Sequence, residues 1–268
     1  MKKALYLLTF MICLLLTTAS FADPVEELVK SFETKATNGD AESQWNLGAL
    51  YEDRYNDYVK ARKWYEKSAA QGYMFAQASL AEMYYNGRGV PQNYAKAVEW
   101  WNKAAKQGSA TAQYNLGIMY NKGQGVRQDY VKAREWFEKA ATQRDVEAQY
   151  NLGVIYYNGK GVKRDLAKAK KWYERAAAQG NASAQYNLGL LYYKGDGVRQ
   201  DYAKAIEWYK KAAAQGDASA QYNLGVMYTK GEGVRQNYAT AKEWYGKACD
   251  NGDQEGCGWY KKLNLKGY

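Results

Sequence analysis

The sequence predicts an all-α fold, an α/α superhelical solenoid of about six helix-turn-helix repeats of 36 residues with a capping helix at each end. The first observation is a fixed period, because the dipeptide Leu-Gly recurs every 36 residues at positions 116, 152, 188 and 224. The second is that each period holds two stretches whose apolar residues are spaced three and four apart, as in amphipathic helices. The third is a Gly-x-Gly-Val segment between these stretches. Such a period is typical of solenoids, in which each repeat packs only on its neighbours.

The first helix of each repeat is clearest in the copy at residues 182–217. Ala184, Leu188 and Leu191 are spaced four and three apart and predict one buried stripe. Gly189 lies in the middle of this helix, where glycine costs about 1 kcal/mol relative to alanine. Its recurrence in other repeats predicts that a second helix approaches too closely for a side chain.

The second helix begins after the glycine-rich loop. The two glycines of the loop are expected to adopt positive φ, one of them ending the first helix. Asp201 is expected to cap the second helix. The pair Trp208-Tyr209 has an aromatic counterpart in every repeat and accounts for much of the content of 9 Trp and 27 Tyr. Aromatic residues at this helical spacing indicate a core, not a surface on which nucleic-acid bases stack.

The first 22 residues are predicted to be a signal peptide. Lys2 and Lys3 precede an apolar run over residues 4–16, and Ser20-Phe21-Ala22 is a small-residue cleavage site, so we place cleavage after Ala22. The alternative is a membrane anchor, but the run is shorter than the roughly 20 residues that a spanning helix needs. We therefore expect no stable membrane span and a periplasmic or secreted mature protein.

The rest of the chain divides into caps and repeats. Residues 23–40 are expected to form an N-terminal capping helix, and residues 254–268 a C-terminal half-repeat cap. The repeats between them, over 41–253, are expected at 41–73, 74–109, 110–145, 146–181, 182–217 and 218–253.

Composition argues against nucleic-acid binding and against catalysis. The formal net charge is +10, but Lys and Arg alternate with Glu through every repeat, as on solvated helix faces. There is no His, no Ser-x-x-Lys motif and no Lys-Thr-Gly motif. The carboxylates fall at capping or helix-surface positions, with no odd pair outside the repeat pattern. We therefore expect no enzyme activity, no cofactor and no metal site.

The repeated pattern A-x-A-Q-Y-N-L-G-x-x-Y-x-x-G-x-G-V-x-x-D-Y-x-K-A-x-x-W-Y-x-K-A-A-x-Q-G resembles the Sel-one-like (Sel1-like) repeat, a relative of the tetratricopeptide repeat. The resemblance covers about residues 41–260. It implies a right-handed α/α superhelix and a role as a protein–protein interaction scaffold, and we expect a monomer. Some cysteine-rich exported relatives are described as penicillin-binding or weakly β-lactamase-like, so that activity is one alternative. A secreted effector that interacts with a host is another.

Two cysteines, Cys249 and Cys257, remain after signal cleavage. In an exported protein such a pair favours a disulfide, here between the last full repeat and the C-terminal cap. The placement also resembles that in secreted, cysteine-rich members of the family. Two free thiols are the alternative, and a zinc site would need more ligands.

A candidate binding surface follows from the family resemblance, because first helices line the concave face in repeats of this kind. Asn side chains have donors and an acceptor for the backbone of an extended peptide, and Lys favours an acidic or carboxylate-ended ligand. The alternative is that Asn and Tyr only join adjacent repeats. We name these residues the Tyr–Asn–Lys face: Tyr114, Asn115, Lys122, Tyr150, Asn151, Tyr186, Asn187, Lys194, Tyr222, Asn223 and Lys230.

Overall fold

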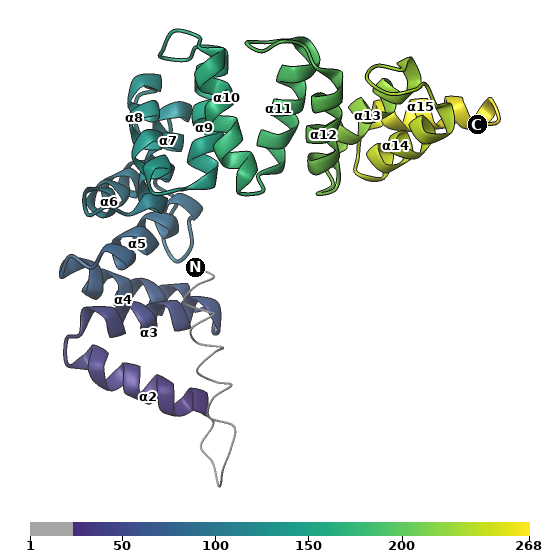
Figure 1. Ribbon diagram of the computed structural model, residues 1–268. Coiled ribbons are helices and arrows are strands. Elements are labelled where there is room, and N and C mark those ends of the chain that lie inside the picture. The colour runs from purple at the N-terminus through teal and green to yellow at the C-terminus, as the bar shows by residue number, and fades with distance from the viewer. Residues whose placement is uncertain (1–23) are drawn as a thin grey trace. The chain divides into compact units, whose positions relative to one another are not determined.

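The structure is a computed structural model that describes residues 24–268, and the regular elements of this part of the chain are all α-helices (Figure 1). The predicted signal peptide, residues 1–22, lies outside the described residues, as does Asp23. The prediction of an all-α repeat fold is confirmed.

The chain divides into two compact bodies. The N-terminal body, with residues up to 112 and residues 124–127, contains α2 (Pro24–Thr37), α3 (Ala41–Asp53), α4 (Tyr58–Ala70), α5 (Met74–Asn86) and α6 (Tyr94–Lys106). The C-terminal body, with residues 113–123 and 128–268, contains most of α7 (Ala110–Lys122), then α8 (Tyr130–Thr142), α9 (Val146–Asn158), α10 (Leu166–Ala178), α11 (Ala182–Lys194), α12 (Tyr202–Ala213), α13 (Ala218–Lys230), α14 (Tyr238–Asp250) and α15 (Gln254–Leu265).

Each repeat is a pair of helices whose ends are set by local chemistry. Within the fifth repeat, α11 and α12 lie side by side, as Figure 1 shows. Gly195 ends α11 with a left-handed φ of 77°, and the Asp201 carboxylate accepts a hydrogen bond from the Lys204 backbone N–H at the start of α12. The second loop glycine, Gly197, has a φ of 68°, and a Cβ there would lie 2.4 Å from the Cβ of Leu166. The loop therefore rests against the second helix of the preceding repeat.

The two helices of a repeat meet at a glycine and an aromatic ring. A Cβ on Gly189 would lie 2.5 Å from Cδ1 of Tyr209, which is fully buried. Gly153 has the same relation to Tyr173, and Gly225 to Tyr245. The predicted packing role of the mid-helix glycine is thus confirmed, and the second residue of the aromatic pair is the one that fills the space between the helices.

Successive repeats are joined by a buried glutamine that sequence analysis did not single out. Gln185 is 6% exposed. Its Nε2 donates to the Ala177 carbonyl at the end of the preceding repeat, at 3.3 Å, and its Oε1 accepts from Gln215 Nε2 at 2.8 Å. An amide left without partners in this position would cost about 1–3 kcal/mol. The same inter-amide bond recurs for Gln44, Gln77, Gln113, Gln149 and Gln221.

The last junction uses cysteines in place of this glutamine. Cys249 and Cys257 lie at disulfide distance, with Cα atoms 4.5 Å apart and a sequence separation of 8. One repeat earlier, Gln221 Nε2 donates to the Ala213 carbonyl across the same separation of eight residues, at 3.0 Å. The disulfide position therefore coincides with the position of the amide–carbonyl hydrogen bond, and it links α14 to α15.

We expect Gly189→Ala to destabilise the protein by about 1–3 kcal/mol, because the new methyl group overpacks the contact with Tyr209. Helix propensity alone predicts the opposite sign, a gain of about 1 kcal/mol. Gly258 in α15 is the matched control, because a Cβ there would meet nothing within 4 Å. Urea unfolding measures both variants. A stabilised Gly189→Ala protein would contradict the packing role.

Candidate functional site

The eleven residues of the Tyr–Asn–Lys face lie on α7, α9, α11 and α13 of the C-terminal body. Their tyrosines are half-buried, and each ring packs on the buried aromatic ring of its own repeat. The ring centroids are 5.9 Å apart for Tyr114–Phe137, 6.0 Å for Tyr150–Tyr173, 5.8 Å for Tyr186–Tyr209 and 5.6 Å for Tyr222–Tyr245. One side of each tyrosine is therefore part of the repeat core.

The asparagines of this face also contact the protein itself. Asn223 is hydrogen-bonded to Tyr186 of the preceding repeat. Burial raises the pKa of the Tyr186 hydroxyl, and this hydrogen bond offsets part of the rise. Asn151 Nδ2 donates to the Glu147 carbonyl one turn earlier, at 2.8 Å. The Tyr–Asn pair thus joins repeats at one junction at least.

The lysines are the most accessible part of the face. Lys122, Lys194 and Lys230 are all exposed. Lys230 Nζ lies 3.6 Å from the Glu232 carboxylate, and Tyr193 and Glu232 raise the pKa of this lysine. Glu232 lies in the loop that follows α13, and its carboxylate also accepts a hydrogen bond from the Tyr193 hydroxyl at 2.9 Å.

Near the C-terminus the face meets the cap. Burial, together with a hydrogen bond to Glu255 of α15, raises the pKa of Tyr222 to about 12. The rings of Tyr245 and Trp259 stack with centroids 5.8 Å apart. The cap thereby covers part of the last repeat.

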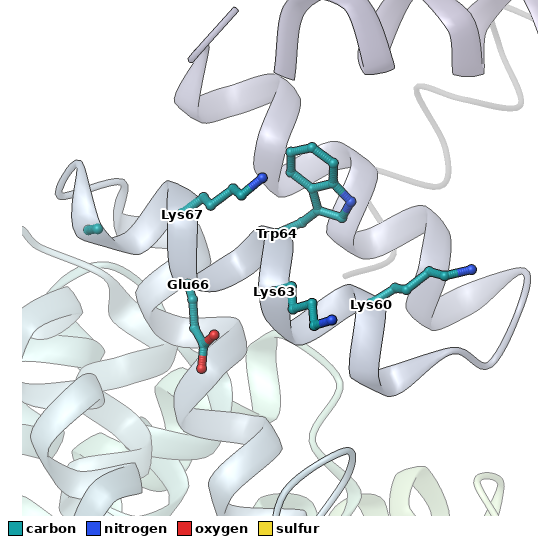
Figure 2. A pocket seen from close by; sticks show the side chains of 6 residues that line it. Lys60, Lys63, Trp64, Glu66 and Lys67 are labelled. Carbon is teal, nitrogen blue, oxygen red and sulfur yellow. The ribbon is translucent and has the colours of Figure 1, made fainter. Parts of the chain in front are cut away.

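The second helices carry a different series, in which a cation lies over the tryptophan that begins each aromatic pair. Figure 2 shows Trp64 on α4 with Lys60 and Lys67 on either side, and Lys67 Nζ is 4.0 Å from the ring centroid. This depression of about 560 Å³ is lined by α4 alone, so it is an open surface and not an enclosed site. On the other second helices the pairing repeats at Trp100–Lys103, Trp136–Lys139, Trp172–Arg175, Trp208–Lys211 and Trp244–Lys247. The capping helix α15 has one further pair, Trp259–Lys262.

An acidic pair in the N-terminal body corrects one expectation from the sequence. Glu82 occupies the position at which later repeats have Ile118, Val154 or Leu190. Burial raises its pKa, and the nearby Glu52 raises it further. Glu52 accepts a hydrogen bond from the Tyr65 hydroxyl at 2.9 Å, and burial raises its pKa too. An odd carboxylate pair therefore exists, and comparing each repeat position by position could have found it.

No group of three or more Cys, Asp or Glu side chains among residues 24–268 is placed to hold a metal ion. In the same part of the chain, no helix has the length and apolar character needed to cross a membrane.

We expect Glu82→Gln to stabilise the protein at neutral pH. The folded-state pKa of Glu82 lies above the ordinary value of 4.5, so the protonated carboxyl is the form that the fold favours. The stability that the protonated Glu82 carboxyl contributes is fully present below pH 4.5 and is lost as the pH rises through the raised pKa. Melting curves should show Glu82→Gln above wild type by a few degrees at neutral pH, with the two converging in acid. The exposed Glu99→Gln on α6 is the control, and a pH-independent difference would contradict this explanation.

Comparison with known proteins agrees with the repeat architecture. The Sel1 repeat family matches residues 41–73, 75–109, 110–145, 146–181, 182–217 and 218–253. A protective antigen present in uropathogenic Escherichia coli strains, displaying an SLR fold, is 35% identical with a TM-score of 0.81, over 89% of this chain and 56% of that one. A Sel1 repeat protein from Oxalobacter formigenes is 34% identical with a TM-score of 0.73, over 80% of this chain and 84% of that one.

A sel1-like repeat-containing protein of Acanthamoeba polyphaga mimivirus is 39% identical over 72 residues, which are 26% of this chain and 13% of the viral protein. This chain thus spans about half of the Escherichia coli antigen and a small part of the viral protein. Because the six family matches cover most of its length, this chain belongs to the Sel1 repeat family.

Proposed function

We propose that this protein is a non-catalytic interaction scaffold, exported to the periplasm or secreted, that binds a protein or peptide through the Tyr–Asn–Lys face. Sel1 repeats typically serve as protein-interaction scaffolds, which supports the general role. The observation that carries the choice of face is the exposure of Lys122, Lys194 and Lys230 at one position of three first helices in the same body, α7, α11 and α13. Packing does not require a lysine there, since the first, second and fourth repeats have Asp53, Asn86 and Asn158 instead.

The chemistry of this face suits an extended segment with carboxylates. Ammonium groups at one position of several helices attract an acidic ligand and orient it. The half-buried tyrosines add broad contact at little cost in side-chain entropy, because their rings are already held by the core. Asn187 is half-buried beside them and can pair with a peptide backbone.

Export is supported by two further observations. Cys249 and Cys257 lie at disulfide distance, and disulfides persist in oxidising compartments. One relative is described as a protective antigen present in uropathogenic Escherichia coli strains. Recovery of a mature chain that begins at Asp23 from the periplasm or the medium would support this part of the proposal, and an uncleaved cytosolic protein would contradict it.

We expect Lys194→Glu with Lys230→Glu to weaken capture of the native partner about tenfold or more, because two attractive charges become repulsive. The matched control is Lys171→Glu with Lys210→Glu, which reverses two exposed lysines on the second helices α10 and α12. Chemical cross-linking in the native cell, followed by quantitative mass spectrometry, compares the variants. Equal loss in both double variants, or none in the first, would reject the Tyr–Asn–Lys face.

A further inference from the structure

The first two repeats depart from the repeat pattern on one face of α3 and α5. Phe75 stands where other repeats have Thr, Glu or Ser, and Trp45 where the later repeats have Tyr. Glu52 and Glu82 stand where the fifth repeat has the uncharged residues Tyr193 and Leu190. Tyr73 replaces the capping residue that precedes other first helices. We call these five residues the aromatic–carboxylate face.

Three rings form its aromatic part. The centroids of Trp45 and Phe75 are 5.5 Å apart, and Tyr73 lies 5.9 Å from Trp45 and 5.6 Å from Phe75. Phe75 is 49% exposed. Trp45 Nε1 donates to Ser79 Oγ at 3.1 Å, which fixes the indole, and Ser79 occupies the position of the asparagine in later repeats. The rings are therefore held in place, with one phenyl edge left open to solvent.

Two of these residues lower the stability of their repeat compared with the residues that other repeats have at the same positions. Tyr73 makes no capping hydrogen bond, whereas the Asp145 and Asp217 carboxylates cap α9 and α13. Losing such a cap costs about 1 kcal/mol. Glu82 places a carboxylate where burial disfavours its charge. Departures from local rules are expected at functional sites.

The carboxylates lie beside the rings along both helices. Glu52 follows Trp45 by seven residues on α3, and Glu82 follows Phe75 by seven on α5. Seven residues are about two turns, so each carboxylate shares a helix side with its ring, about 10 Å further along. Arg88 is the cation near both carboxylates, 3.8 Å from Glu52, but α3 itself carries three acidic residues and no basic one. The face is therefore negative at one end and aromatic at the other.

We infer that the aromatic–carboxylate face is a docking surface for a basic, partly apolar segment of a protein. Arginine or lysine side chains would pair with Glu52 and Glu82, and an apolar side chain would cover Phe75 and Trp45. Charge complementarity selects this occupant, since both carboxylates and aromatic ring faces attract guanidinium or ammonium groups. The surface is distinct from the Tyr–Asn–Lys face, which lies in the other body and suits a ligand of the opposite charge.

The test uses the full mature chain and three short fluorescent peptides. One alternates arginine with leucine, the second has glutamate in place of arginine, and the third has serine in place of leucine. The wild-type protein should bind the first peptide most tightly in fluorescence anisotropy. Phe75→Ser and Glu82→Leu install the residues of the fifth repeat, Ser183 and Leu190, so the repeat fold tolerates both.

Each variant is expected to weaken binding of the arginine–leucine peptide about tenfold or more, as truncating a central interface residue does. Glu82→Leu should also reduce the preference for arginine over glutamate, and Phe75→Ser the preference for leucine over serine. Glu147→Ser removes an exposed carboxylate from α9 in the other body and should change nothing. A wild-type protein that shows no preference for the arginine–leucine peptide overturns the inference, as do Phe75→Ser and Glu82→Leu proteins that bind like wild type. The protein with Lys194→Glu and Lys230→Glu should bind the arginine–leucine peptide as wild type does. The result of this experiment therefore does not depend on whether the Tyr–Asn–Lys face binds a partner.

Discussion

The structure depends on a buried side-chain amide near the start of the first helix of each repeat, which at several junctions bonds to the preceding repeat. Gln185 bonds to a carbonyl eight residues before it and to the amide of Gln215 thirty residues after it. The bond to the Ala177 carbonyl joins α11 to the preceding repeat, and the bond to Gln215 joins it to the end of the second helix of its own repeat. The amide thereby fixes where the repeat starts relative to the one before. A solenoid has no central core, so its stability is the sum of such interfaces and of the repeats themselves. The cysteine pair at the last junction occupies the place of one of these bonds.

Beside the glycines, caps and buried glutamines, the first helices carry positions that are only partly buried and that differ between the two bodies. In the C-terminal body these positions carry tyrosine, asparagine and exposed lysine. In the N-terminal body they carry aromatic residues and carboxylates such as Phe75 and Glu82. The two proposed surfaces are opposite in charge, so on these proposals one scaffold would hold two different partners.

Periodicity and glycine chemistry predicted the fold well, because both are local properties. The spacing of Ala184, Leu188 and Leu191 identified the buried stripe, and Gly189 indicated a close helix contact, although the sequence did not show that Tyr209 makes it. The buried glutamine was missed because a polar residue between an alanine and a tyrosine suggests an exposed position. Its burial depends on partners eight and thirty residues away. Glu82 was missed for a related reason, since a glutamate on a helix is ordinary until its position is compared with the apolar residue of the other repeats.

Hydrogen exchange of the Gln185→Leu protein, followed by mass spectrometry, tests the role of the buried glutamine most directly. Leucine has a similar size and is more apolar, so it removes both hydrogen bonds and keeps the volume filled. The account predicts faster exchange at the end of α10 and the start of α11, corresponding to a loss of about 1–3 kcal/mol, with the first turns of α13 unchanged. Exchange in Gln185→Leu that is as slow as in wild type, or slower, would show that burial alone holds the repeats together and would contradict the account.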